Sequence, residues 1–393
     1  MSRASDKAPE GARAGAAAAP GVKGWCPGAW VPMASGDGLV VRVRPRLARL
    51  EPAQVAGLCA LAQAHGNGFL DLTNRANLQI RGVAPEAHEP VLQALAELDL
   101  LDADPQIEGR RNILVTPFWQ RGDRTARLAR ALLAALVDLP ELPAKTGFAV
   151  DTGPQPVLVE DPADFRFERA KAGLILRADG CALGRPVTDR SAIPALLEMA
   201  EWFDAHRSPE RRRMAQVLAA HSLPEAWMTT SPRPRAPRPG PGATPQGALL
   251  GAAFGQIDAG ALARVLHDSG ATALRVTPWR LILLEGAEMP GGSGFITAPG
   301  DPLLSSDACP GAPFCPAASV ETRNLARALA PRVGGGLHVS GCAKGCARSR
   351  PAAMVLTGRD GRFDLIENGH AWDAPSRAGL STQDILEEPS GTR

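Results

Sequence analysis

Four cysteines in the last quarter of the chain have the spacing of a metal site. Cys309 and Cys315 are separated by five residues and Cys342 and Cys346 by three, with 26 residues between the pairs. Zinc sites favour tighter pairs, usually with about two to four intervening residues. A wider loop rich in proline and glycine can enclose a larger object, and four thiolates are the usual ligands of a 4Fe-4S cluster. The spacing therefore predicts an iron–sulfur cluster held by all four cysteines.

Positive charge surrounds the second cysteine pair, because Lys344, Arg348 and Arg350 lie in the same stretch, HVSGCAKGCARSR. A thiolate-bound cluster is net negative, so these cations and the backbone N–H groups of the glycine turns would offset its charge. The competing interpretation is four ordinary buried cysteines. It is the weaker one, since all four lie in loops rich in glycine and proline rather than on apolar faces.

The other cysteines and two histidines have ordinary structural interpretations. Cys59 lies on an apolar helix face and Cys181 in a hairpin, which favours buried thiols. Cys26 stays open between a structural role, which we favour, and a metal or redox role. His338 and His370 lie in the same part of the chain as the four cysteines, but a lone histidine is more often a hydrogen-bonded residue than a ligand.

Basic residues lie at predicted strand ends and turns of the first half. They are Arg75, Arg81, Arg110, Arg111 and Lys145. Arginine binds carboxylates through a planar fork, so such a cluster would suit a ligand with several carboxylates. Most basic residues are simple surface charges, and we would interpret each of these five in that way if it stood alone. Their positions relative to an internal repeat favour a binding role instead.

The internal repeat predicts the elements that position these residues. Residues 64–82 align with residues 268–286 at an offset of 204, which matches glycines, threonines and strand phase. Each copy follows an amphipathic helix that ends at a glycine suited to a left-handed cap, Gly66 or Gly270, and then alternates through two short strands. Two copies are too few for a solenoid. We expect two α+β half-modules around a pseudo-two-fold axis, rather than a chance likeness.

The remaining segments predict α/β modules after each copy. The expected elements are a strand at 111–118, a helix at 123–142, a hairpin at 171–187 with Asp179-Gly180 at its turn, a helix around 189–205, a proline-rich linker at 231–247, and a C-terminal hairpin with Asp360-Gly361 at its turn.

Composition excludes several classes of function. The chain has 393 residues, of which 43 are basic and 41 acidic, so its net charge of +2 indicates neither a nucleic-acid nor a membrane partner. No run approaches the ~18 apolar residues of a membrane helix, and the N-terminus lacks the continuous apolar core of a signal peptide. We therefore expect a cytoplasmic protein. An odd number of cysteines argues against a disulfide framework there.

The chain resembles the sulfite and nitrite reductase superfamily, whose hallmark is this arrangement of cysteines. HVSGCAKGCAR is similar to its second cluster motif, TNRANLQIRG to the arginine-bearing strand pair beside its sirohaem, and RRNILVTP and LPAK to the next active-site segments. The resemblance implies an α+β fold of the sulfite/nitrite reductase type. It would have two pseudo-two-fold-related ferredoxin-like half-modules and two α/β modules, the C-terminal one carrying the 4Fe-4S cluster.

The resemblance begins at about residue 28 and implies boundaries along the chain. We expect a flexible tail at 1–27, the first ferredoxin-like half-module at 28–100, the first α/β module at 101–206, a helical segment and proline-rich linker at 207–246, the second ferredoxin-like half-module at 247–300, and the iron–sulfur module at 301–393.

Within the superfamily the chain resembles the precorrin-3B synthase branch of aerobic cobalamin biosynthesis, through residues 26–45, 161–180 and 276–280. That branch implies a monooxygenase that uses O2 and reducing equivalents to hydroxylate precorrin-3A at C20 and close a γ-lactone. Two departures from the reductases support it. Lys145 is followed by Thr146 and Gly147, so the second lysine of the reductase K-x-K motif is missing, and the gap between the cysteine pairs is short for a reductase.

The resemblance also implies roles for individual residues. Catalytic roles fall to Lys145 and Arg111, and substrate binding falls to Arg75, Arg81, Arg110 and Asn77. Cys346 holds the position that bridges cluster and haem iron in reductases, but whether sirohaem or mononuclear non-haem iron binds O2 stays open. No G-x-G-x-x-G follows a strand, so we expect NADH to act indirectly, through a separate reductase or ferredoxin.

Two alternatives stay open. One is a small sirohaem-dependent nitrite or sulfite reductase, against which the missing second lysine argues, and a visible spectrum with a nitrite assay would distinguish it. The other is a non-catalytic iron–sulfur or zinc-binding protein, against which the basic residues argue, and iron and sulfide analysis would identify it.

Overall fold

The structure, a computed structural model, describes residues 27–333 and 335–387. These residues divide into two compact units: the first unit ends at Leu304, and the second unit begins at Ser305. Cys26 and all but the last residue of the predicted tail lie outside the described residues. Within the described ranges, no helix is long and apolar enough to cross a membrane. Each unit is described by itself below.

The duplicated part of the first unit forms two five-stranded antiparallel sheets, with strand orders β1-β2-β5-β4-β13 and β11-β12-β15-β14-β3. The strands are β1 Met33–Ser35, β2 Gly38–Val43, β3 Arg49–Leu50, β4 Phe69–Leu72, β5 Leu78–Val83, β11 Gly242–Thr244, β12 Gly247–Gly251, β13 Gln256–Asp258, β14 Ala273–Val276 and β15 Leu281–Glu285. The expected pair of strands in each copy is confirmed as β4–β5 and β14–β15.

The two sheets exchange one strand each. Strand β3, from the first half of the chain, pairs with β14 of the second sheet, and β13, from the second half, pairs with β4 of the first. An ion-pair network fixes the first exchange: Glu285 accepts from Arg49 Nε at 2.8 Å and from Arg275 Nε at 2.9 Å. The halves are therefore interlocked through reciprocal edge strands.

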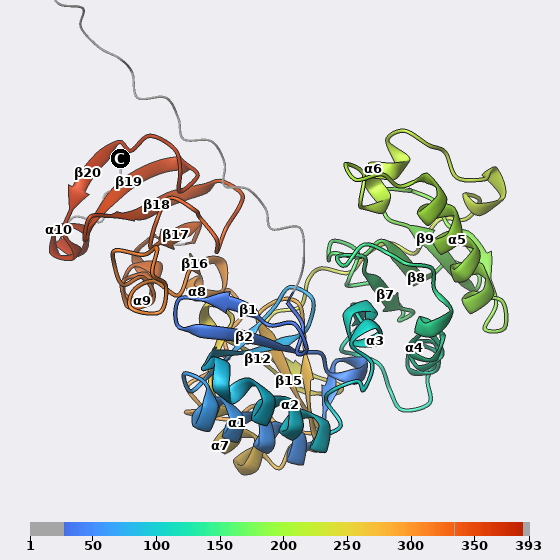
Figure 1. The fold of residues 1–393 in the computed structure, drawn as a ribbon, viewed down its shortest axis with the longest axis horizontal. Coiled ribbons are helices and arrows are strands. Elements are labelled where there is room, and N and C mark those ends of the chain that lie inside the picture. The colour runs from blue at the N-terminus through green and yellow to red at the C-terminus, as the bar shows by residue number, and fades with distance from the viewer. Residues whose placement is uncertain (1–26, 334, 388–393) are drawn as a thin grey trace, which may run out of the picture. The chain divides into compact units, whose positions relative to one another are not determined.

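Two symmetry-related helices pack against each other on one side of these sheets (Figure 1). They are α1 (Pro52–His65) and α7 (Ala259–Ser269), and α2 (His88–Glu97) packs beside α1. Helix α1 begins with a reciprocal cap between Glu51 and Gln54, and α7 begins at Asp258, whose carboxylate accepts from Ala261 N at 2.7 Å.

The predicted left-handed glycine caps are confirmed for one helix and wrong for the other. Gly270, after α7, has φ 64° and ψ 22°. Gly66, after α1, is extended instead, with φ −114° and ψ −162°. A Cβ at Gly66 would approach Arg81 O to 2.8 Å, so close packing against strand β5, rather than a positive φ, accounts for this glycine.

The turns between the paired strands repeat in backbone detail. Thr73 Oγ1 accepts from the backbone N of Arg75, and Thr277 Oγ1 accepts from the backbone N of Trp279, each at 3.3 Å. Ala76 and Arg280, again 204 residues apart, have φ 51° and 61°. Positive φ is costly for residues with a side chain, so its presence at both positions supports duplication over chance likeness.

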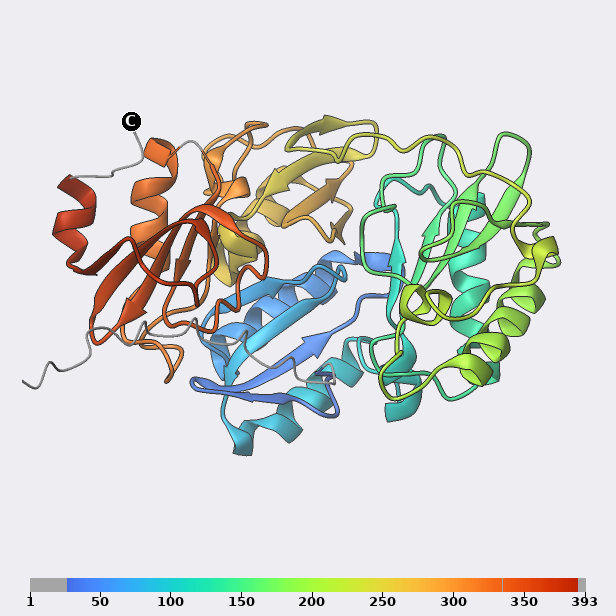
Figure 2. The same cartoon turned by 90° about the horizontal axis from the view of Figure 1, so that it is seen from above.

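The first α/β module, also in the first unit, is built on a mixed sheet with strand order β10-β9-β8-β7-β6, in which β6, β7 and β8 run parallel. Helices α4 and α5 contact each other and pack on this sheet (Figure 2). The elements are α3 Pro105–Arg110, β6 Ile113–Val115, α4 Arg124–Ala134, β7 Phe148–Asp151, β8 Phe165–Arg169, β9 Leu174–Ala178, β10 Arg185–Val187, α5 Ala192–His206 and α6 Met214–Leu218.

Several predicted elements of this module differ in length. The strand expected at 111–118 is only Ile113–Val115, because Arg111 and Asn112 complete a turn after α3. The helix expected at 123–142 ends at Ala134 and tightens into a 3₁₀ turn. The hairpin at 171–187 is confirmed as antiparallel β9–β10. The proline-rich segment is bound to the module, since Arg233 N donates to Arg169 O at 2.8 Å.

The second unit contains one sheet with strand order β16-β17-β18-β19-β20. Its strands are β16 Asp307–Ala308, β17 Leu337–Ser340, β18 Ala352–Arg359, β19 Arg362–Gly369 and β20 Arg377–Leu380, and its helices are α9 Arg323–Val333 and α10 Thr382–Glu387, with α8 (Pro302–Ser305) preceding them. The hairpin predicted at Asp360-Gly361 is confirmed, with φ 48° and 77° at its turn.

Candidate functional site

The four predicted cluster cysteines lie in two loops at one edge of the second unit's sheet. Strands β16 and β17 run parallel, with Ala308 opposite Val339, so the loops that follow them leave the sheet at the same end. Cys309 begins the first loop and Cys342 the second. The backbone N–H of Gly341 donates to Cys309 Sγ at 3.1 Å. The topology therefore brings the two cysteine pairs together.

The thiol of Cys346 is under the electrostatic influence of the other three. Burial raises the pKa of Cys346, and the neighbouring thiols of Cys342, Cys309 and Cys315 raise it further, whereas Lys344 lowers it. Cys309 is buried, Cys315 and Cys342 are half-buried and Cys346 is exposed. Cys346 therefore lies within electrostatic reach of the other three thiols.

This donor set fits a thiolate-bound cluster better than a single ion. Over residues 27–333 and 335–387, no three His, Cys, Asp or Glu side chains converge tightly enough to hold one metal ion. A four-iron cube holds its ligands farther apart than one zinc does, and it accepts thiolates alone. Four thiols in two neighbouring loops, with a backbone N–H directed at one sulfur, are a donor set that fits such a cluster.

Two members of the predicted ring of positive charge have described interactions. Lys344 acts on Cys346. Arg348 is committed elsewhere, because its Nη1 donates to Asp307 Oδ2 at 2.8 Å and its remaining donors reach Pro351 O. Asp307 is buried on strand β16, so Arg348 ties the second cysteine loop to the base of the first.

The other cysteines and histidines have structural surroundings. Cys59 is buried on α1, where burial raises its pKa to about 11, and Cys181 packs on the core of the first α/β module. His338 is fully buried in strand β17. His370 bonds Asp373 at 3.1 Å and stacks on Trp372.

Two of the predicted basic residues meet in the first unit. Arg75, on the β4–β5 turn, donates from Nη2 to the backbone carbonyl of Lys145 at 2.9 Å. A Cβ at Gly147 would lie 2.9 Å from Arg75 Nη1, so the glycine gives the guanidinium room. Both Arg75 and Lys145 are half-buried. The arginine turn therefore orients the segment that carries the candidate catalytic lysine.

The symmetry-related turn makes a matching contact. Trp279 stands 204 residues after Arg75, and its indole N–H donates to Asp161 Oδ2 at 2.9 Å. Asp161 lies on another loop of the same α/β module, and burial raises its pKa. Both turns of the duplicated part thus bind loops of one module, the first through Lys145 and the second through Asp161.

The other predicted site residues have different surroundings. Arg81 donates to Ser35 and Asp37, at 2.9 and 3.4 Å. Arg111 is buried and donates from Nε to Asp102 Oδ2 at 2.7 Å; burial lowers its pKa, against the effect of Asp102. Asn77 is buried beside Arg111.

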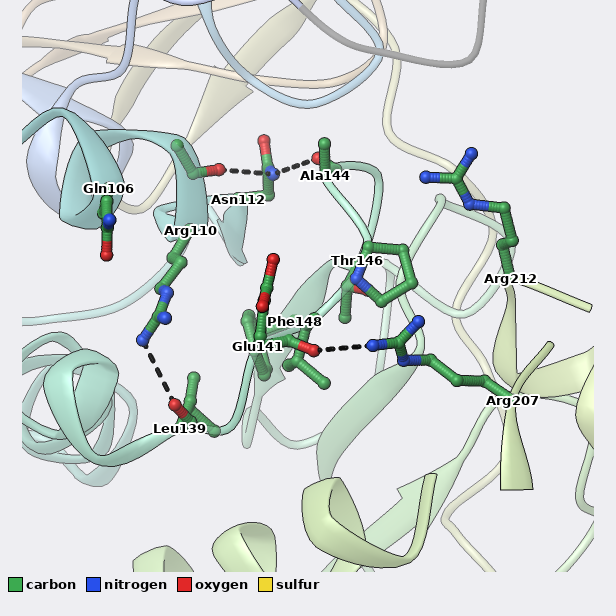
Figure 3. A pocket seen from close by; sticks show the side chains of 13 residues that line it. Gln106, Arg110, Asn112, Leu139, Glu141, Ala144, Thr146, Phe148, Arg207 and Arg212 are labelled. Carbon is green, nitrogen blue, oxygen red and sulfur yellow. Dashed lines mark hydrogen bonds between the residues drawn. The ribbon is translucent and has the colours of Figure 1, made fainter. Parts of the chain in front are cut away.

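Arg110 instead lines a cavity of about 530 Å³ in the first α/β module (Figure 3). Its guanidinium donates to the carbonyls of Leu136 and Leu139. Sequence reasoning missed the other polar residues of this cavity. Asn112 and Thr146 follow Arg111 and Lys145 directly but lie in turns outside the strands, where no periodic pattern marks them. The full lining is Gln106, Gly109, Arg110, Asn112, Leu139, Glu141, Leu142, Pro143, Ala144, Thr146, Phe148, Arg207 and Arg212.

Comparisons with known proteins agree with this arrangement. Residues 31–98 match the nitrite/sulfite reductase ferredoxin-like half domain. The structure of the Mycobacterium tuberculosis NirA protein is similar with a TM-score of 0.62 at 17% identity, covering 90% of this chain and 82% of that one, and at this identity it shows the fold alone. The predicted α+β fold of the sulfite/nitrite reductase type, with ferredoxin-like half-modules, is confirmed.

A sequence relative is more specific. A precorrin-3B synthase from Sinorhizobium sp is 31% identical over 395 residues, which cover 90% of this chain and 84% of that protein. That coverage includes both the duplicated part and the cysteine loops. The resemblance to this branch, drawn from the residues alone, is thereby confirmed. The chain belongs to the precorrin-3B synthase family and is an oxidoreductase of the monooxygenase type.

Proposed function

We propose that this chain hydroxylates precorrin-3A at C20, with closure of a γ-lactone, in aerobic cobalamin biosynthesis. One oxygen atom of O2 enters the product and the other leaves as water, with electrons and protons supplied from outside. The observation that carries the proposal is the relationship to the Sinorhizobium precorrin-3B synthase over nine tenths of the chain.

A 4Fe-4S cluster, held by Cys309, Cys315, Cys342 and Cys346, would supply one-electron transfer when bound. The proximity of the four thiols and the N–H of Gly341 support this assignment. A second iron centre for O2, either sirohaem or mononuclear non-haem iron, belongs to the proposal, with Cys346 at the position that would bridge a haem. NADH is the indirect donor, through a separate reductase or ferredoxin.

The chain's own residues hold the substrate in this proposal. Precorrin-3A is a tetrapyrrole edged with carboxylates, and guanidinium groups bind carboxylates in a directed, bidentate way. Arg75 lies at the Lys145 segment and is the best placed of them. Lys145 would hold or deliver a proton near the reacting face. The buried Arg111 would act through Asp102 on the shape of the site.

Arg81, Arg110 and Asn77 stay proposed substrate residues that single variants can test. The side chains of Arg81 and Arg110 bond protein groups and Asn77 is buried, so a loss of substrate affinity must be separated from a loss of folding. Thermal unfolding measured beside the substrate dissociation constant makes that separation.

The decisive experiment combines metal analysis with isotope labelling. Anaerobically purified protein is analysed for iron, sulfide and zinc, and by EPR with and without precorrin-3A. It is then turned over under ¹⁸O₂ with a reductase and ferredoxin, and we expect the product to gain one labelled oxygen atom. Sirohaem bands with nitrite turnover would support the reductase instead, and zinc without sulfide would support a structural role.

A matched pair of cysteine variants tests the ligand assignment. Cys342→Ser is expected to lose the EPR signal of the cluster and the hydroxylation, whereas Cys181→Ser keeps both. Equal losses in the two variants would show that the ligands are wrongly assigned. Oxidation of NADH by the purified chain alone would contradict a separate electron donor.

A further inference from the structure

The cavity lined by Arg110 has the features of a second ligand site. Its volume of about 530 Å³ falls in the range of small-molecule sites. Neither Arg75 nor Lys145 lines it, although Ala144 and Thr146, on either side of Lys145, both do. The cavity therefore lies beside the segment of the candidate catalytic lysine, while its lining is a different set of side chains.

Two buried polar atoms in the lining have no hydrogen-bond partner among the described residues. Asn112 Nδ2 donates to the carbonyls of Gly109 and Ala144, which fixes the orientation of the amide and leaves Oδ1 as an acceptor. That Oδ1 and the Thr146 hydroxyl make no hydrogen bond with the residues that the structure describes. Asn112 is 5% and Thr146 4% exposed, and buried polar groups are normally paired. A donor from a ligand would satisfy Asn112.

Positive charge exceeds negative charge around the same cavity. Arg110 donates to neutral carbonyls, and Arg212 makes no side-chain hydrogen bond or ion pair within the described ranges. Arg207 is paired with Asp204 and also donates to Glu141 O. Figure 3 shows Arg110 on one side of the cavity and Arg207 and Arg212 on the other.

Glu141 is the one carboxylate in the lining, so the arginines leave a surplus of positive charge. Guanidinium groups on two sides favour an anion with more than one oxygen. A ligand hydroxyl could donate to Asn112 Oδ1 and accept from the Thr146 hydroxyl, which would satisfy both unpartnered atoms.

From these observations we infer that the cavity binds a small organic anion, a carboxylate or a phosphate, that also carries a hydroxyl group. The cavity shares Arg110 with the residues proposed for precorrin-3A but is lined by neither Arg75 nor Lys145, and ligand binding in it can be measured without hydroxylation. A ligand there contacts Ala144 and Thr146 and so touches the segment that carries Lys145.

Isothermal titration calorimetry at low ionic strength on the full cluster-containing chain tests the inference. The probes are two matched pairs, L-malate with succinate and glycerol 3-phosphate with propyl phosphate, which differ mainly in hydroxyl groups. We expect the hydroxyl-bearing member of at least one pair to bind roughly threefold to tenfold more tightly. The tighter pair identifies carboxylate or phosphate as the anion. Equal affinities within both pairs, or no binding at all, would overturn the inference.

Variants localise the binding. Arg212→Gln is expected to weaken the better probe about tenfold, and Thr146→Val to reduce the preference for the hydroxyl, because valine keeps the shape and removes the oxygen. Arg130→Gln, an exposed arginine on α4, is the matched control for charge and should leave binding unchanged. Equal effects of Arg212→Gln and Arg130→Gln would refute the site.

Cys342→Ser is expected to retain probe binding while losing hydroxylation, so the two proposals can fail separately. Loss of probe binding in Cys342→Ser, with the fold retained, would contradict the independence of the cavity.

Discussion

The buried carboxylate of Asp151 leads to a specific prediction of how the free energy of unfolding depends on pH. This residue ends strand β7, is 2% exposed, and accepts from the backbone N–H groups of Val157 and Leu158 at 2.6 and 2.9 Å. Burial raises its pKa from 3.8 to about 6, the two N–H groups oppose the shift, and the adjacent carboxylate of Glu168 adds to it. In the register of the parallel strands β7 and β8, Glu168 lies directly opposite Asp151.

The size of the effect follows from that shift. The folded chain holds the Asp151 proton more tightly than the unfolded chain between pH 3.8 and about 6. The stabilisation is therefore complete at low pH and is lost as pH rises through that window. A shift of about two units corresponds to at most about 3 kcal/mol. Asp151→Asn removes the titration while its amide oxygen can still accept from both N–H groups.

The assay is urea unfolding of the wild type and Asp151→Asn at steps from pH 4 to pH 7.5. We expect the variant to become more stable relative to the wild type as pH rises, by up to about 3 kcal/mol, and the difference to level off above pH 6. Asp138→Asn, at an exposed aspartate, is the control and should show a constant difference. A constant difference for Asp151→Asn would refute the reasoning.

Four further variants test the packing and the site. Glu285→Gln is expected to lower the free energy of unfolding by about 3 kcal/mol in urea, because the buried Arg275 loses its carboxylate; a loss below about 1 kcal/mol would contradict the role of this network. Gly286→Ala should cost about 1 kcal/mol in thermal unfolding, since its φ is 75°, whereas Gly109→Ala in helix α3, with open space around it, should stabilise by up to about 1 kcal/mol. Arg75→Lys should lower kcat/KM about tenfold without changing the melting temperature, because an ammonium cannot form the guanidinium fork; unchanged kinetics would remove Arg75 from the site.

The duplicated part was largely predictable because its signals are local. The helical spacing of Val55, Leu58 and Leu61 identifies the face of α1 that is buried. Thr73 and Thr277 then fix the same turn in both copies through side-chain bonds that span only a few residues. Because these interactions join residues that are close together in the chain, a short stretch of sequence is enough to predict them.

The strand exchange and the cavity depend on contacts that no local pattern contains. Strand β3 has only two residues, too few for any periodicity, yet it pairs with β14 more than 200 residues later. Arg111 was predicted as a catalytic group from its motif, but its place beside Asp102 depends on the path of the preceding loop. Asn112 and Thr146 could be recognised only once their unpaired atoms were seen to share a cavity.

Because β3 and β13 are exchanged between the two sheets, the structure predicts how each half of this protein behaves when it is produced separately. When the halves are separated, the sheet of the first half loses β13 and the sheet of the second half loses β3. The backbone groups at each new sheet edge are then free to pair with a strand of another chain. Two identical copies of such a half would restore both edges by swapping the same strand. The single chain thus contains within itself the strand exchange that a domain-swapped dimer makes between two chains, and we expect a separately produced half-module to be a dimer rather than a monomer.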